Sequence, residues 1–442
     1  MKKSKTIVAL ILLAAGVATA RPSLAADDIS LTPESLTLDD ALRLTREHNP
    51  KARQASEDVK AAEARVTEGR SGYFPQISAK AGYRYLDPVS EISLGGTTMK
   101  FMPNNNYDAR ITAEMILYDF GRTGRTVDLA VSGKNAAGIR QDMTLRDLSL
   151  STVKAFYSVI FLREAVKVQE KEIAALQQNL GNMQKRYKEG VSTRFDLLTT
   201  QVRLASSGNR KIDLQNQLDN QEISLRRLCG IKGNGPLNLK GSFEVGATDR
   251  DTSKLASEAF QQRPEILLAR ENLKAATYRK SLSAKEGMPK IVGSASWGTT
   301  NGYVPELNTM RPNVAAGVEI RVPIFTGFRT SATTREAAAM MRSAEQERID
   351  TEELVDAEVC QSVNSLKTSI EKIETTRLQV SQADLAAQHA RIRHQNGLAT
   401  TLDLLNAENS LSEAELANLQ ARYEYVLNAY SVRRAAGDLI RQ

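Results

Sequence analysis

The sequence predicts a mainly α-helical chain whose long antiparallel helical hairpins continue into the strands of a membrane β-barrel. Three observations indicate this fold. Two long stretches lack proline and carry apolar heptads, one short turn motif occurs twice, and four segments alternate in polarity. Each half of the chain carries one proline-free stretch, one turn motif and two alternating segments, so we expect an internal structural duplication.

The first 25 residues are predicted to be a secretory signal peptide. Three lysines precede an apolar run at residues 7–15, and small residues end the segment at Ala25. Removing residues 1–25 takes away four basic residues and no acidic one, so the formal charge falls from +7 to +3. The basic balance of the chain therefore does not indicate a nucleic-acid partner.

The remainder is predicted to consist of two repeats, at residues 26–228 and 255–442, joined by a linker at residues 229–254. Each repeat opens with a helix that passes an x-Pro pair, at Asn49-Pro50 and Arg263-Pro264. These pairs lie 214 residues apart, whereas the glycines of the two turn motifs lie 207 apart. The seven-residue difference must fall between them, in the strand region.

Four strands are predicted at about residues 76–85, 108–118, 290–297 and 313–325, with loops rich in Gly, Pro and Asn at 86–106 and 298–312. Runs of about ten residues suit a tilted strand that crosses a bilayer, with its apolar face toward lipid and its polar face toward water. Aromatic residues at the strand ends are typical of an interfacial girdle: Tyr73, Phe74, Tyr118, Phe120, Phe325 and Phe328. A soluble hairpin whose apolar face packs on the helices is the alternative.

The helical stretches carry coiled-coil patterns. No proline lies between Pro103 and Pro236, and none follows Pro323. A helix over residues 121–189 would be about 100 Å long at 1.5 Å per residue. Two apolar stripes follow its heptads: Leu145, Val159, Val166, Ile173, Leu180 and Tyr187, and Leu148, Ala155, Leu162, Leu176 and Met183. The second hairpin uses smaller residues: Leu366, Ile373, Val380, Ala387, Ala407, Ala414, Ala421 and Ala435.

Each long helix is predicted to end in a tight turn, at residues 190–193 and 397–400. Gly190 and Gly397 suit the left-handed residue just after a helix. Thr193 with Asp196, and Thr400 with Asp403, fit capping boxes that begin the next helix. Because only about three residues separate the helices, each pair must form an antiparallel αα-hairpin.

Four strands are too few to close a membrane barrel, since the smallest barrels formed by one chain have eight. The chain must therefore assemble with copies of itself. Three subunits give twelve strands, and a dimer gives only eight. We expect a homotrimer in which a twelve-stranded β-barrel, with four strands from each chain, continues into a helical cylinder.

Several motifs resemble the TolC-type outer membrane efflux protein family across nearly the whole mature chain. They are the opening Leu38-x-x-Ala41-Leu42 with Asn49-Pro50, the segment Gly72-Tyr73-Phe74-Pro75-Gln76-Ile77, the duplication, and both Gly-x-x-Thr-x-x-Asp-Leu-Leu turns. The resemblance implies a homotrimeric outer membrane barrel with an α-helical barrel across the periplasm. It implies an exit duct of a tripartite efflux or type I secretion system, which passively exports substrates delivered by an inner membrane transporter and a periplasmic adaptor.

The resemblance also implies where functional residues lie. Four residues would form the periplasmic aperture or gate: Asp196, Asp403, Tyr187 and His394. Six residues would lie in the tips that contact the adaptor: Gly190, Val191, Ser192, Gly397, Leu398 and Ala399. A tyrosine, an arginine and an aspartate that help to close the family's gate are replaced here by His394, Ala399 and Asn406.

His394 has two interpretations. It is either a solvated helix residue or a switch that favours closure when its protonated imidazole contacts Asp196. The two cysteines, Cys229 and Cys360, lie at similar distances from the turns, so they are either bridged or free.

Two further functions remain open, a periplasmic coiled-coil scaffold and a stand-alone diffusion porin. No enzyme is indicated, and we expect no cofactor or metal. The three histidines, His48, His389 and His394, show no metal-ligand spacing, and the sequence contains no Gly-rich phosphate loop.

Overall fold

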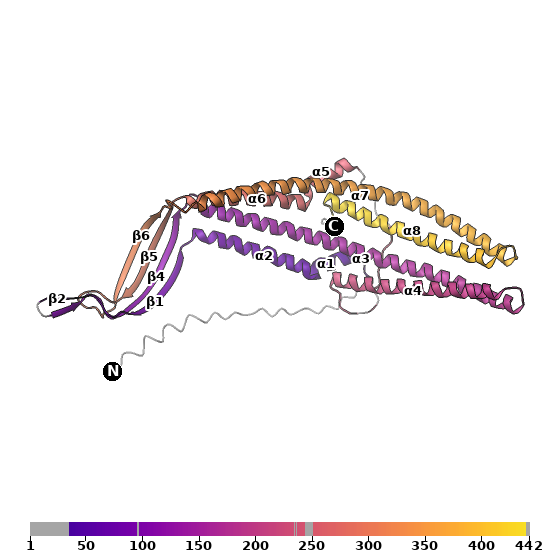
Figure 1. The fold of residues 1–442 in the computed structure, drawn as a ribbon, viewed down its shortest axis with the longest axis horizontal. Helices are drawn as coiled ribbons and strands as arrows, with labels where there is room; N and C mark the ends of the chain where they lie inside the picture. The colour runs from indigo at the N-terminus through magenta and orange to yellow at the C-terminus, as the bar shows by residue number, and fades with distance from the viewer. Residues whose placement is uncertain (1–34, 95–96, 234, 236, 244–250, 439–442) are drawn as a thin grey trace, which may run out of the picture.

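The chain forms an elongated strip with a β-sheet at one end and two helical hairpins at the other (Figure 1). This computed structural model describes residues 35–94, 97–233, 235, 237–243 and 251–438. The predicted signal peptide lies outside the described residues. Within the described part, none of the helices combines the length and the apolar character that crossing a bilayer requires.

The helices show the duplication directly, because each helix of the first half has a counterpart of the same length in the second. The matched lengths are 11, 21, 67 and 36 residues. Short 3-10 turns, η2 (Ser71–Tyr73) and η3 (Lys285–Gly287), lead into the strands of each half. In chain order the helices are α1 (Leu38–His48), α2 (Pro50–Arg70), α3 (Arg122–Lys188), α4 (Arg194–Cys229), α5 (Thr252–Gln262), α6 (Pro264–Ala284), α7 (Arg329–Gln395) and α8 (Thr401–Ala436).

Local chemistry sets where these helices begin. Thr37 and Asp40 form a reciprocal capping box at the start of α1. Pro50 and Pro264 each occupy the first turn of a new helix, where the missing N–H removes no helical hydrogen bond. The expected helix over residues 121–189 is confirmed as α3, and its 67 residues span about 100 Å.

The main sheet is antiparallel, with the order β1 (Gln76–Tyr85), β4 (Asn105–Tyr118), β5 (Lys290–Thr300) and β6 (Arg311–Arg321). The predicted strand ends need correction. The second strand begins at Asn105 and the third extends to Thr300. The fourth ends at Arg321 rather than 325, just before Pro323, which has no N–H to donate to a ladder. The loop after β1 also contains an unpredicted hairpin of β2 (Glu91–Leu94) and β3 (Thr97–Lys100).

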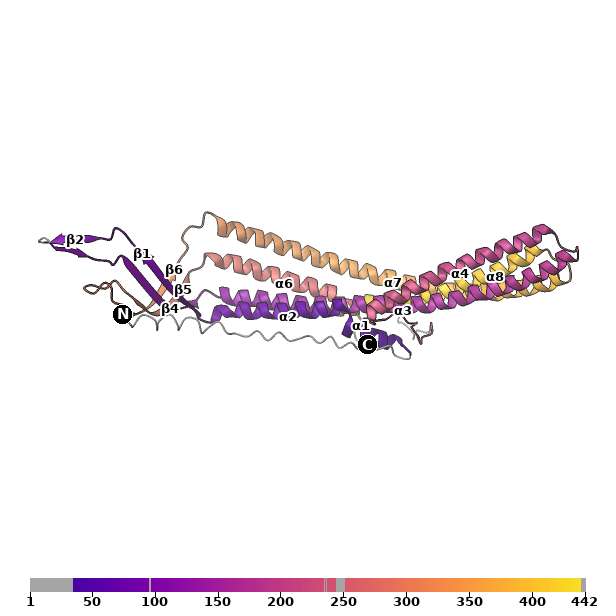
Figure 2. The ribbon, with the colours of Figure 1, turned by 90° about the horizontal axis from the view of Figure 1, so that it is seen from below.

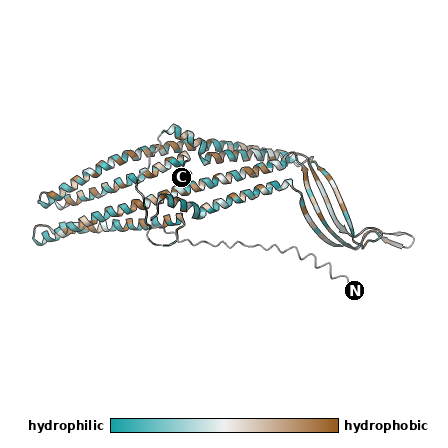
Figure 3. Ribbon diagram, turned by 180° about the vertical axis from the view of Figure 1, so that it is seen from behind, coloured by the Kyte–Doolittle hydropathy of each residue, from teal (hydrophilic) through white to brown (hydrophobic). Residues whose placement is uncertain are grey.

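The strand register keeps apolar residues opposite apolar residues across all four strands. Ala79 pairs with Ile111, which in turn pairs with Trp297, and Trp297 pairs with Val314. Hydrophobic and hydrophilic positions both occur along each strand (Figure 3). Trp297 is 63% exposed and Val314 75% exposed in the single chain. The helices therefore do not cover the apolar face, and the alternative of a soluble hairpin packed on them is wrong.

The helices form a strip that is one layer thick over most of its length. Beside the sheet, neighbours contact one another in the order α2, α3, α6 and α7, and toward the far end in the order α4, α3, α8 and α7 (Figures 1 and 2). The two long edges of the helical strip are therefore α2 with α4 on one side and α7 on the other.

The predicted heptads pack the hairpins. All five members of the second α3 stripe are buried: Leu148, Ala155, Leu162, Leu176 and Met183. In the second hairpin the small residues Ala387, Ala414, Ala421 and Ala435 are buried, as expected for a seam where backbones approach closely. The first α3 stripe is less covered, and its last member, Tyr187, is exposed.

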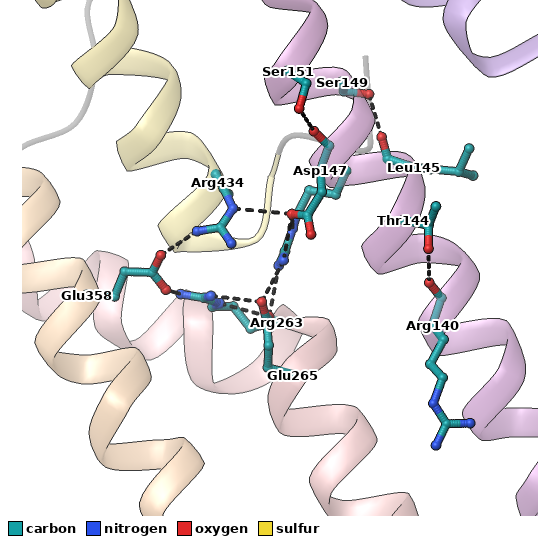
Figure 4. Close-up of polar contacts among 11 residues, drawn as sticks. Arg140, Thr144, Leu145, Asp147, Ser149, Ser151, Arg263, Glu265, Glu358 and Arg434 are labelled. Atoms are coloured by element: carbon teal, nitrogen blue, oxygen red, sulfur yellow. Dashed lines mark hydrogen bonds and ion pairs between the residues drawn. The ribbon is translucent and has the colours of Figure 1, made fainter. Parts of the chain in front are cut away.

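A closed ring of ion pairs joins four helices near the middle of the strip (Figure 4). Glu265 accepts bonds from Arg146 at 2.5 and 2.8 Å and from Arg263 at 3.0 and 3.1 Å. Arg263 also donates to Glu358 at 2.6 Å, and Glu358 accepts from Arg434. Asp147 bonds both Arg434 and Arg146, which completes the ring. Three arginines and three carboxylates alternate, so the cluster is neutral.

The two cysteines do not form a disulfide. Cys229 and Cys360 are both free, and Cys229 is buried with its Sγ 3.8 Å from the Thr45 hydroxyl and 3.6 Å from the Ala41 carbonyl oxygen. Burial raises the pKa of the Cys229 thiol to about 11, so this group stays protonated and unreactive at neutral pH.

Candidate functional site

The two hairpin tips have the same backbone geometry. Gly190 and Gly397 adopt φ angles of +74° and +72°, in the left-handed region that favours glycine. In each turn the next amide, that of Val191 or Leu398, donates back across the turn at 2.8 Å to the carbonyl of an arginine at the helix end. These bonds satisfy the last free carbonyl groups of α3 and α7, which confirms both predicted helix stops.

Both predicted capping boxes are present. The Thr193 hydroxyl accepts from the Asp196 amide at 3.1 Å, and the Asp196 carboxylate accepts from the Thr193 amide at 3.2 Å. Thr400 and Asp403 repeat this arrangement at 3.1 and 2.9 Å. The hydrogen bond from the Thr400 hydroxyl lowers the pKa of Asp403, so its carboxylate stays charged at the tip. Asp196 and Asp403 are thus confirmed as helix caps.

Each tip exposes two large apolar side chains at equivalent positions. Val191 and Phe195 project from the first turn, and Leu398 and Leu402 from the second, all more than half exposed. Ser192 and Ala399 are half-buried beside them. Exposed apolar residues at the end of a hairpin indicate a surface that contacts another protein.

The two hairpins differ in how their last helical turns are covered. Tyr187 is 43% exposed, whereas His394, at the equivalent position of the second hairpin, is 8% exposed. Thr401, Leu404 and Leu405 are buried as well. The interpretation of His394 as a solvated residue is therefore wrong. The first hairpin covers part of the second hairpin near the tips, and His394 lies where the two hairpins meet.

In the part of the chain that the structure describes, three side-chain hydrogen bonds link the two hairpins closest to their tips, and a fourth, from the Ser412 hydroxyl to the Glu172 carboxylate at 3.0 Å, lies slightly farther along. The Arg186 guanidinium donates to the His394 carbonyl oxygen at 3.4 Å, and Arg203 donates to the Asn406 side-chain oxygen at 3.3 Å. The Thr401 hydroxyl donates to the sulfur of the buried Met183 at 3.6 Å. These three bonds are long or weak, so few strong polar contacts hold the second hairpin against the first at the tips themselves.

A polar cavity of about 370 Å³ lies between α3, α7 and α8, beside these contacts. Its lining includes Asn179, Asn182, Arg186, Arg391, His394 and Glu408. Arg391 and the buried Glu408 pair through two hydrogen bonds, at 2.5 and 2.7 Å, which tie α7 to α8 within the second hairpin. The second hairpin is therefore held together more firmly than it is held to the first.

The surroundings of His394 favour the neutral imidazole. Burial lowers its pKa, the Arg186 charge lowers it further, and Asp196 opposes both effects only in part. The structure records no hydrogen bond or ion pair between His394 and Asp196 among the described residues. These surroundings disfavour the hypothesis that protonation favours closure, because burial and the Arg186 charge both oppose a charged imidazole here.

Acid is therefore expected to loosen the tips. A base whose pKa is lower in the folded protein contributes full stability above its ordinary pKa of about 6.5, and that contribution is lost as the pH falls below it. We expect the conductance of the protein in lipid bilayers to rise between pH 7 and pH 5, and this rise to disappear in His394→Gln. A wild-type conductance that falls on acidification would instead support the protonated contact with Asp196.

Sequence patterns did not reveal the contacts of Arg186 and Arg203 between the hairpins, or the Arg391–Glu408 pair within the second hairpin. Arg186 carried a weak signal, as a basic residue in the last turn of a helix. The others carried none, because their partners are set by packing between distant segments. Among the described residues, no group of three or more His, Cys, Asp or Glu side chains is placed to hold a metal ion.

Comparison with known proteins gives a consistent result. The family model described as "Outer membrane efflux protein" matches residues 41–231 and 255–438. The chain is 24% identical to the outer membrane protein TolC of Vibrio cholerae over 407 residues, which cover 90% of each protein. It is 25% identical to the outer membrane efflux protein BepC of Brucella suis, with 92% of this chain and 86% of BepC covered.

Solved structures show the same fold. The outer membrane protein VceC of Vibrio cholerae superposes with a TM-score of 0.76 at 21% identity, covering 90% of this chain and 96% of VceC. The outer membrane channel CmeC of Campylobacter jejuni gives a TM-score of 0.76 at 16% identity, covering 91% of this chain and 85% of CmeC. The arrangement of sheet, strip and hairpins is thus shared with channel proteins of low sequence identity.

Proposed function

Because the chain belongs to the outer membrane efflux protein family, we propose that three copies of it form an exit duct through the outer membrane. In this duct an inner membrane transporter and a periplasmic adaptor deliver the substrates, and the protein supplies a passive path. The observation that supports this proposal most is that both long edges of the strip lack partners in the described chain, with an edge strand and exposed apolar helix residues on each. A periplasmic scaffold is not compatible with membership of this family.

The sheet has two edges whose backbone groups lack strand partners in the described chain. β1 pairs only with β4, and β6 pairs only with β5. Exposed edges attract further strands, and closure into a barrel removes them. In a ring, β6 of one subunit pairs with β1 of the next, which is a head-to-tail contact that closes by rotation.

The helical edges carry matching apolar seams. On α4, exposed apolar residues follow a heptad along the outer side: Phe195, Leu198, Val202, Ala205, Ile212 and Ile223. On α7, Leu378, Leu385 and Ile392 are exposed at seven-residue intervals. Each seam has the spacing of one side of a coiled coil without its partner helix. We infer that α4 of one subunit packs against α7 of the next.

Three subunits fit this geometry better than two. A dimer would close eight strands, and the interior of an eight-stranded barrel is filled by its own side chains. A trimer closes twelve strands and leaves room for water. The hairpin tips lie at the end of the strip opposite the sheet (Figure 1), so they would surround the periplasmic opening. Asp196, Asp403, Tyr187 and His394 would then line or control the opening, and Val191 and Leu398 would meet the adaptor.

Cross-linking tests the predicted contact between subunits. Val202 lies nine residues past the first turn and Leu385 twelve residues before the second, so both are about 15 Å from the tips. In a variant without native cysteines, Val202→Cys with Leu385→Cys should give covalent trimers with a short bismaleimide. Val202→Cys with Leu354→Cys is the control, because Leu354 lies on α7 far from the hairpin tip and therefore far from Val202 of any subunit. Equal yields from both pairs, or monomers alone, would contradict this arrangement.

A further inference from the structure

The charges of the main sheet all lie on one face. The strand register places nine charged residues on the same side of β1, β4, β5 and β6, and none on the other side. The Arg321 guanidinium lies 4.0 Å from the Glu114 carboxylate across the sheet, which confirms the shared face. Six of these residues are basic and three acidic: Lys80, Arg84, Arg110, Lys290, Arg311 and Arg321, and Asp108, Glu114 and Glu319. The face thus carries a formal charge of +3 in each chain.

The acidic residues neutralise only part of this charge. Asp108 pairs with Arg110, and Glu319 pairs with Arg321 at 2.6 Å. In the part of the chain that the structure describes, no ion pair involves Lys80 or Arg84, and both side chains are exposed. β1 therefore contributes two unneutralised cations, one near its middle and one near its outer end.

The register also places two cations directly opposite each other. Lys80 pairs with Arg110, although like charges in a cross-strand pair destabilise a sheet. On the other side of Arg110 stands Gly298, where an added Cβ would lie 2.4 Å from the Ala109 carbonyl oxygen and 2.7 Å from the Arg110 Cβ. Any residue with a side chain is excluded there, so no acidic group can stand beside Arg110 on β5. A like-charge pair is tolerable where water solvates both groups.

We propose that Lys80 and Arg84 of the three subunits, beside the Arg110–Asp108 pair, form a cationic belt inside the barrel, which makes this part of the duct favour anionic solutes. The proposal rests on the trimeric duct proposed above. Twelve strands spaced about 4.8 Å apart and tilted by about 40° give a backbone radius of about 12 Å. The side chains reach inward from that radius, so a solute in the lumen stays within a Debye length of about 10 Å at 0.1 M salt. The field of three such faces therefore acts on every solute that passes.

Ion selectivity in planar bilayers tests the belt. The tips would dominate the selectivity of a closed duct, so all proteins carry the tip substitutions Arg186→Ser and Arg203→Ser. Reversal potentials in a KCl gradient are compared for this background, for Lys80→Gln/Arg84→Gln, and for the charge-preserving control Lys80→Arg/Arg84→Lys. We expect the glutamine variant to lower the permeability ratio of chloride to potassium by about twofold or more, and the control to leave it unchanged.

The outcomes separate the two proposals. A ratio that stays the same in the glutamine variant, or that falls equally in the charge-preserving control, would overturn the cationic belt and leave the duct intact. An absence of channel conductance in all three proteins would overturn both the duct and the belt.

Discussion

Replacing Arg146 with methionine is expected to lower the free energy of unfolding by about 3 kcal/mol, because the partly buried Glu265 carboxylate loses one of its two arginine partners. The Arg146 side chain is 1% exposed and donates two hydrogen bonds to Glu265. Burial alone would raise the pKa of Glu265, but the bonds from Arg146 and Arg263 outweigh burial and hold this pKa well below its usual range. Removing Arg146 leaves Arg263 as the remaining arginine partner of Glu265.

The measurement is urea unfolding of the purified protein in detergent, followed by circular dichroism. Lys60→Met is the matched control, because Lys60 pairs with Glu57 at 2.8 Å on an exposed surface, with side chains 65% and 68% exposed. Exposed pairs contribute less than about 1 kcal/mol, so this variant should unfold almost like the wild type. Equal destabilisation by the two substitutions would show that the ring of ion pairs does not anchor the four helices.

Replacing Arg186 and Arg203 together with serine is expected to raise the single-channel conductance severalfold at neutral pH. These arginines make two of the few bonds between the hairpins near the tips, to the His394 carbonyl oxygen and the Asn406 side chain. Without them the second hairpin can move outward as a unit, since the Arg391–Glu408 pair still holds α7 to α8. The opening would then widen without loss of the barrel.

Arg210→Ser provides the control for this experiment, because Arg210 is an exposed arginine of the same helix as Arg203 and lies farther from the tip. Its removal changes the charge of α4 without touching the contact between hairpins. If the Arg210 variant conducts as well as the double variant, charge rather than contact sets the conductance. If the double variant conducts like the wild type, the tips are not held closed by these bonds.

The sequence allowed the turns to be predicted in detail because their chemistry is local. A glycine with positive φ and a Thr-x-x-Asp box satisfy backbone groups within a few residues, so Gly190 and Asp196 carry their roles in the sequence itself. The two faces of each strand were also predictable, because alternation fixes which residues of a strand share a face. The β2–β3 hairpin shows the limit of this reasoning, because its alternation covers only Glu91 to Leu94 before Gly95-Gly96, and so short a run inside a Gly- and Pro-rich loop does not by itself predict a strand.

The contacts between distant segments could not be predicted from one sequence. Arg186 bonds a carbonyl group 208 residues away, and Arg146 meets Glu265 across 119 residues. Such pairs depend on how α3 packs against α6, α7 and α8, which no local pattern encodes. His394 illustrates the consequence, because its burial results from the second hairpin lying against the first and not from its neighbours in sequence.

Single-particle electron microscopy of the full chain in lipid nanodiscs tests whether the protein forms a trimeric duct. We expect a particle of three subunits with threefold symmetry, in which a water-filled passage runs from the twelve-stranded barrel to the hairpin tips. A monomeric particle, or a ring of subunits without an axial passage, would contradict it.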